Sequence, residues 1–145
     1  MSGALLIGTL MILVCLAIQC MALAIVLRQL HSLEQSRFSF RSWMGATLVL
    51  SVVTIIILAG NLTQIALWAG LFIYLGEFSD FMTAFYHSVV NFSTLGYGDV
   101  VMSDKHRLLG ALEALNGVLM IGLSTGTMFV VVNEMLSDVW EHRDE

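Results

Sequence analysis

The sequence holds very little charge for its length. Only 12% of its 145 residues are charged, 58% are hydrophobic, and it contains no proline. A water-soluble domain of this size needs far more polar surface, so that class is excluded. Residues 1–27 and 42–76 carry no charged side chain, and residues 108–133 carry only Glu113. Each stretch exceeds the roughly 20 apolar residues that cross a bilayer core. The sequence therefore predicts an all-α integral membrane protein with three transmembrane helices.

Several other classes of protein are excluded because the sequence lacks the residue patterns that they require. The formal net charge of −5 gives no support for nucleic-acid binding. No nucleophile–base pair or metal-ligand spacing is present, so we expect neither an enzyme nor a small-molecule substrate. No arginines recur at every third position, which excludes a voltage sensor. The only two cysteines, Cys15 and Cys20, lie in the first apolar stretch, and we interpret them as inert buried thiols.

The basic residues predict the orientation in the membrane. The first span, residues 1–28, lacks a basic n-region and an Ala-x-Ala site, which favours a retained helix over a cleaved signal peptide. Basic residues near span ends favour the cytoplasm, so we place the connector 29–42 and the short acidic tail 137–145 there, in the cell membrane. The N-terminus would then be outside. This arrangement sets four cytoplasmic residues against two outer ones: Arg28, Arg37, Arg41 and Arg143 against Lys105 and Arg107.

Two helices of unusual length are predicted between the connector and the last span. Residues 43–76 could reach ~52 Å as one helix, so this outer helix tilts, bends near Gly60 or projects beyond the lipid. Ser79 is a suitable N-cap for a helix over 80–92. At about 13 residues this second helix cannot cross the bilayer, which indicates a re-entrant segment.

A glycine-containing hexad follows the short helix: Thr94-Leu95-Gly96-Tyr97-Gly98-Asp99. A chain that turns successive carbonyls toward one axis must alternate its backbone handedness, and glycine reaches positive φ without a Cβ clash. Such carbonyls can replace the water shell of a dehydrated monovalent cation. Non-helical backbone at membrane depth is tolerated only where protein buries it or where it lines an aqueous path. One strand cannot surround an ion, so several chains must meet on an axis.

The hexad closely resembles the selectivity filter of tetrameric potassium channels, the example from which this carbonyl mechanism is known. The chain as a whole resembles a short prokaryotic-type channel with one extra N-terminal helix. The resemblance implies a homotetramer in membrane lipid that conducts K⁺ passively. The implied pore module is 43–136, with outer helix 43–76, pore helix 80–92, filter 94–99 and inner helix 107–136. It also implies that Thr94, Leu95, Gly96, Tyr97 and Gly98 hold K⁺.

Further roles are implied around the filter. Asp99 would close the outer mouth and bond to Tyr86 of the pore helix. Tyr86 and His87 stand where many family members have two tryptophans, and Leu95 replaces the more usual valine. Glu113 is expected to support the filter by a bond to His87, Ser88 or Asn91, either as a structural acid or as a source of pH sensitivity.

The inner helix carries the candidate gate. Gly117 resembles the family's gating hinge, with close helix packing as the alternative, since both follow from the missing side chain. Three- and four-residue spacing predicts a common face, which the resemblance places along the cavity, with Phe129 as a candidate constriction. The residues of this face are Val118, Ile121, Thr125 and Phe129.

Two other functions stay open at this point. A weakly selective monovalent cation channel would result if the altered surroundings loosened the filter. A potassium-uptake transporter subunit is less favoured, because those proteins carry four divergent pore repeats in one chain and this chain has a single filter.

Overall fold

The chain folds into four helices over the residues that the structure describes. The structure is a computed structural model that describes residues 2–35 and 43–141. Its elements are α1 (Ser2–Gln35), α2 (Trp43–Tyr74), α3 (Phe81–Phe92) and α4 (Arg107–Glu141). Three of them contain apolar segments long enough to cross a membrane: Gly3–Leu30, Met44–Tyr74 and Arg107–Leu136. The prediction of an all-α protein with three such helices is confirmed.

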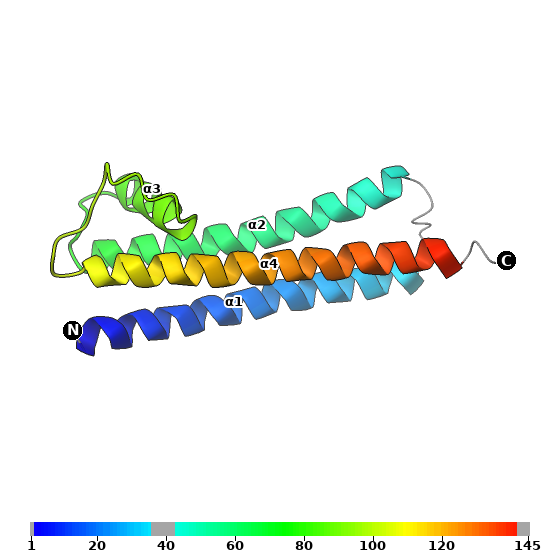
Figure 1. Cartoon of the computed structure of the whole chain (residues 1–145), viewed down its shortest axis with the longest axis horizontal. Coiled ribbons are helices and arrows are strands. Elements are labelled where there is room, and N and C mark those ends of the chain that lie inside the picture. The colour runs from blue at the N-terminus through cyan, green and yellow to red at the C-terminus, as the bar shows by residue number, and fades with distance from the viewer. Residues whose placement is uncertain (1, 36–42, 142–145) are drawn as a thin grey trace.

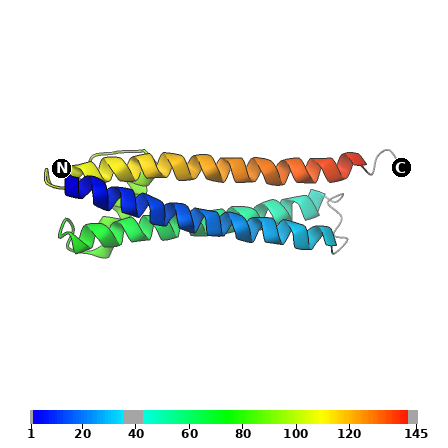
Figure 2. The same cartoon turned by 90° about the horizontal axis from the view of Figure 1, so that it is seen from below.

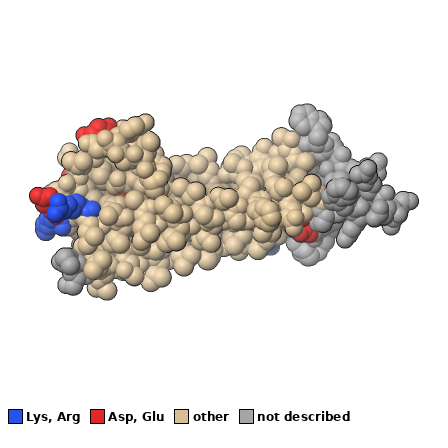
Figure 3. Space-filling model, in the orientation of Figure 1, with Lys and Arg blue, Asp and Glu red and all other residues tan. Residues whose placement is uncertain are grey.

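The three long helices lie side by side, and the short α3 lies at one end (Figures 1 and 2). α1 and α4 run in the same direction and α2 runs in the opposite one. The start of α1, the end of α2, α3 and the start of α4 are therefore at the same end, which we call the outer end. Charged side chains appear near the two ends of the molecule, while the middle of the face in Figure 3 has none.

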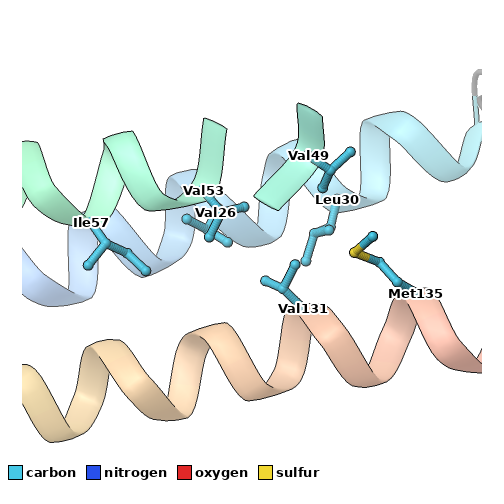
Figure 4. Close-up of a cluster of buried hydrophobic side chains, with 7 residues drawn as sticks. All are labelled: Val26, Leu30, Val49, Val53, Ile57, Val131 and Met135. Atoms are coloured by element: carbon cyan, nitrogen blue, oxygen red, sulfur yellow. The ribbon is translucent and has the colours of Figure 1, made fainter. Parts of the chain in front are cut away.

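Two of the apolar clusters join α1 to the other long helices. One is at the inner end, away from α3, and all three long helices contribute to it: Val26, Leu30, Val49, Val53, Ile57, Val131 and Met135 (Figure 4). The other includes Cys15, Trp68, Phe72 and Leu109, at the outer end. In lipid, apolar side chains gain little by leaving the solvent, so van der Waals packing and polar bonds hold such helices together.

The outer helix stops at a glycine. α2 runs unbroken through Gly60 and ends at Tyr74, two residues before the predicted end. Gly76 has a φ of 75°, the Gly76 amide donates to the Ile73 carbonyl (2.9 Å), and the Glu77 amide donates to the Phe72 carbonyl (3.0 Å). This pattern is a Schellman motif, which requires a left-handed residue at the position of Gly76.

Other boundaries differ from the predictions. Asp80, not Ser79, caps α3, because Asp80 has the extended backbone of an N-cap and its carboxylate accepts from the Thr83 amide at 2.9 Å. That bond lowers the pKa of Asp80. α1 continues past the predicted end at residue 28, and α4 continues to Glu141, past residue 136. Cys15 is buried as expected, but Cys20 is exposed on the single chain.

Candidate ion-conduction site

The backbone of the hexad alternates between left-handed and ordinary conformations. φ is 61° at Thr94, 57° at Gly96 and 73° at Gly98, while Leu95 and Tyr97 have no positive φ. This is the alternation that the glycine spacing predicts for carbonyls turned to one side. The left-handed Thr94 was not foreseen, because a β-branched residue rarely adopts that conformation.

The start of the hexad is bonded to the end of α3. The Val90 carbonyl accepts from the amides of Leu95 (3.0 Å) and Gly96 (3.2 Å), and the Asn91 carbonyl accepts from the Thr94 amide (2.8 Å). The last carbonyls of a helix have no partner within it. Here the hexad supplies those partners, so the negative end of the α3 dipole lies next to the start of the hexad.

The end of the hexad is bonded to α3 as well. The Tyr86 hydroxyl donates to Asp99 Oδ2 at 2.8 Å, the contact that the family resemblance implies. This hydrogen bond to the carboxylate raises the pKa of Tyr86 and keeps the phenol protonated. The next residues of the two segments also meet, because His87 Nδ1 lies 2.9 Å from the Val100 carbonyl oxygen. Two successive α3 residues therefore fix the two residues at the exit of the hexad.

A third attachment holds the segment before α4. The Glu77 carboxylate accepts from the amide (2.7 Å) and hydroxyl (2.7 Å) of Ser103 and lies 2.5 Å from His106 Nδ1. Burial alone would raise the pKa of Glu77, but the bonds from Ser103 and His106 outweigh it and lower the pKa to about 2. We call these three residues the outer clasp. Sequence patterns did not predict the outer clasp, although Glu77 is the first acid after 35 uncharged residues, 42–76.

A hydrogen-bonded chain runs from the exit of the hexad to α4. A carbonyl oxygen only accepts, so His87 Nδ1 carries the proton toward Val100, and Nε2 of the neutral ring accepts. Asn91 Nδ2 donates to this Nε2 (2.9 Å) and also to Glu113 Oε2 (3.3 Å). Of the three partners expected for Glu113, Asn91 donates to it directly, Ser88 also interacts with it, and His87 is connected through Asn91. We call His87, Asn91 and Glu113 the relay.

The relay is enclosed by protein. Glu113 is 0% and His87 5% exposed, and the His87 ring packs against the rings of Phe72 and Phe78. Burial lowers the pKa of His87, although the Val100 carbonyl and the charges of Asp99 and Glu77 act in the opposite direction. The neutral ring that the bonds require is thus also the form that burial favours.

Gly117 allows α4 to touch the end of α3. A Cβ atom at Gly117 would lie 1.9 Å from the Phe92 carbonyl oxygen, which leaves no room for a side chain. A Cβ at Gly122, one and a half turns further along, would meet nothing within 4 Å. The sequence left a gating hinge and close helix packing as alternatives for Gly117. The structure shows the close packing.

The predicted pore-lining face is uncovered in the single chain. The exposed fraction is 53% for Val118, 43% for Ile121 and 71% for Phe129, and Thr125 is exposed too. In the hexad, 67% of Tyr97 is exposed. All of these side chains are therefore exposed on the described part of the single chain.

A comparison with protein-family models decides the family. Residues 52–134, more than half of the chain, match the model described as "Ion channel". The chain belongs to this ion channel family. The match spans most of α2, all of α3 and the hexad, and most of α4, and it leaves α1 outside. This family has the two-transmembrane-helix pore domain of potassium channels, as the sequence resemblance indicated. No curated protein and no solved structure matches the chain.

Proposed function

We propose that this ion channel is potassium-selective and that four identical chains form the pore, with K⁺ passing down its gradient. The alternating backbone at residues 94, 96 and 98 is the observation that carries the proposal. Rings of carbonyl oxygens with this geometry take the place of the hydration shell of K⁺. A single chain supplies one oxygen per ring, so the site requires several chains around an axis.

The anchoring of the hexad supports the same proposal. A selective filter must keep its oxygens in place when an ion leaves, and α3 holds both ends of the hexad by directional bonds. Four copies of Asp99 at the mouth would concentrate cations by their negative potential. The exposed face of α4 would line the cavity or meet a neighbouring chain, with Phe129 as the constriction. The chain would sit in the cell membrane with its N-terminus outside and its C-terminus in the cytoplasm.

The test is ion flux through the purified full-length chain in liposomes. We expect uptake of K⁺ to exceed uptake of Na⁺ by at least tenfold, with block by Ba²⁺, and a particle with four times the 16.0 kDa chain mass. Equal K⁺ and Na⁺ flux would instead support a weakly selective channel. A particle of one, two or three chains would contradict the shared pore.

Gly96 gives the sharpest variant. Alanine at a φ of 57° is strained whatever space surrounds it, so Gly96→Ala should abolish selective flux while the chain still inserts into membranes. The matched control is Gly70→Ala, a helical glycine of α2 whose Cβ would meet nothing within 4 Å. It should conduct as the parent does. Unchanged selectivity in Gly96→Ala would refute the role of the hexad.

A second variant tests the constriction. Phe129→Ala removes an exposed ring from the inner half of α4, so we expect a higher basal current and faster access of a cytoplasmic blocker. If both stay unchanged, Phe129 is not the constriction.

A further inference from the structure

α1 lies outside the family match, yet it is bonded to both long helices of the pore module. The Gln64 Nε2 atom donates to Gln19 Oε1 at 2.9 Å, and Gln19 Nε2 donates to Ser124 Oγ at 3.0 Å. Ser124 Oγ in turn donates to the Met120 carbonyl at 2.8 Å. We infer that α1 is an internal brace for α4, with Gln19 tying the inner helix to the outer helix. We call Gln19, Gln64 and Ser124 the Gln19 bridge.

The bridge lies deep within three apolar helices. Only 4% of Gln19 and 0% of Gln64 is exposed, and both lie well inside the candidate membrane spans. An amide without a partner in this environment is costly, so partners on a neighbouring helix fix the register of the helices. Gln19 uses both ends of its amide, the oxygen toward α2 and the nitrogen toward α4. The α1 helix is therefore the middle member of the bridge, and a shift of α4 along it breaks a bond.

The position of the bridge along α4 shows which movement it restrains. Gly117 is locked against the backbone of Phe92, whereas Gly122 is surrounded by open space. Ser124 follows Gly122 by two residues. A bend of α4 at Gly122 would move Ser124 away from Gln19. It would also move Phe129, which lies beyond the same glycine.

The apolar cluster at the inner end acts on the same half of α4. Val131 and Met135 of α4 pack with Val26 and Leu30 of α1, as Figure 4 shows. Both contacts between α1 and this half of α4 lie beyond Gly122, so α1 holds the helix straight in the arrangement seen in Figures 1 and 2. We assign the closed state to this straight arrangement, with Phe129 as the constriction. Its effect on conduction rests on the proposed function, but the bridge itself does not.

Single-channel recording in bilayers tests the effect on conduction. Leucine has no hydrogen-bonding group, so Gln19→Leu should raise the open probability at least about threefold, as expected for loss of one or two interhelical bonds in a membrane. The control is Thr127→Val, which removes a hydroxyl that bonds only within α4, to the Leu123 carbonyl. An unchanged or lowered open probability in Gln19→Leu, or an equal rise in the control, would overturn the brace.

A second measurement does not depend on conduction. The variants Gln19→Leu and Ser124→Ala and their combination are unfolded in detergent micelles. Because the two side chains share a bond, the double variant should lower the unfolding midpoint by less than the sum of the single shifts. Additive shifts would overturn the bridge. A parent protein without selective K⁺ flux would instead overturn the proposed function, and the micelle experiment would still decide on the bridge.

Discussion

Apolar clusters lie at both ends of the molecule, and at the outer end directional hydrogen bonds also fix the chain. At the outer end, Tyr86 and His87 donate hydrogen bonds to Asp99 and Val100, and the Glu77 carboxylate accepts from Ser103; these bonds fix the end of the hexad and the segment after it. At the inner end, the described side chains are joined by an apolar cluster of valine, leucine, isoleucine and methionine. Directional bonds restrict the chain to a narrow range of geometries, whereas van der Waals contacts restrain neighbouring helices with less angular preference. A rigid outer end and a movable inner end are what a selective filter with a separate gate requires.

The largest effect is expected where α4 meets α3. Gly117→Ala places a Cβ 1.9 Å from the Phe92 carbonyl oxygen, and backbone atoms cannot rotate away as a side chain can. We expect a loss of roughly 3 kcal/mol or more in unfolding free energy and no selective flux. Thermal unfolding in micelles and liposome flux measure the two effects.

Gly122→Ala is the matched variant on the same helix. Nothing lies within 4 Å of the added methyl group, and alanine favours a helix over glycine by about 1 kcal/mol. Its stability should be equal to or higher than that of the parent. Equal losses in both variants would show that α4 does not contact α3 as described.

The relay should make the outer end sensitive to acid. A protonated His87 would point an Nε2–H at the amide nitrogen of Asn91, and two donors cannot bond to each other. Because burial lowers the pKa of His87, the unfolded chain takes up the proton first, so stability is lost as pH falls below about 6.5. The acidic side chains around the ring are Asp99, Glu77 and, through Asn91, Glu113. Flux measured between pH 7.5 and 5 should decline.

Two substitutions test which member of the relay causes the response to pH. His87→Gln has a carboxamide that can donate to Val100 and accept from Asn91 but does not titrate in this range, so its flux should depend less on pH. Glu113→Gln replaces the carboxyl group at the α4 end of the relay with an amide of the same size. If it responds to pH and selects K⁺ as the parent does, Glu113 is a structural acid without a regulatory role.

Whether the sequence alone predicts a feature of this site depends on how far apart in the sequence the residues that form it lie. The three spans and the hexad follow from local patterns: runs without charge, and glycines at alternate positions. Contacts between distant segments do not. Three partners for Glu113 were equally consistent with the sequence, because the choice of Asn91 depends on how α3 turns against α4. Likewise, the close approach at Gly117 needs the position of Phe92. Gln19 is a single amide in an apolar run, which indicates a polar contact with another helix. Its partners cannot be read from the sequence, because they lie 45 and 105 residues away.

The outer clasp should resist acid far better than the relay. The pKa of Glu77 is lowered from the ordinary 4.5 to about 2, so its contribution to stability is complete above pH 4.5 and is lost as pH falls toward 2. Glu77→Gln removes the charge that Ser103 and His106 bond to. We expect a lower unfolding temperature at pH 7 and little difference from the parent at pH 2. A parent that loses the clasp already at pH 5.5 would contradict this assignment.

The smallest effect is expected at Asp104, another acid of the outer end. Asp104 pairs with Arg107 at 3.1 Å, but the two side chains are 95% and 76% exposed. Water and salt screen such a pair, and ordering two mobile side chains costs about as much as the pair gains. Asp104→Asn should therefore leave the unfolding temperature and selectivity unchanged within error, at low and at high salt. If Glu77→Gln lowers the unfolding temperature and Asp104→Asn does not, the hydrogen bonds that Glu77 accepts fix the outer end. Negative charge near the mouth would then not be the cause. Equal losses in the two variants would mean that the general field of the outer acids matters more than the clasp.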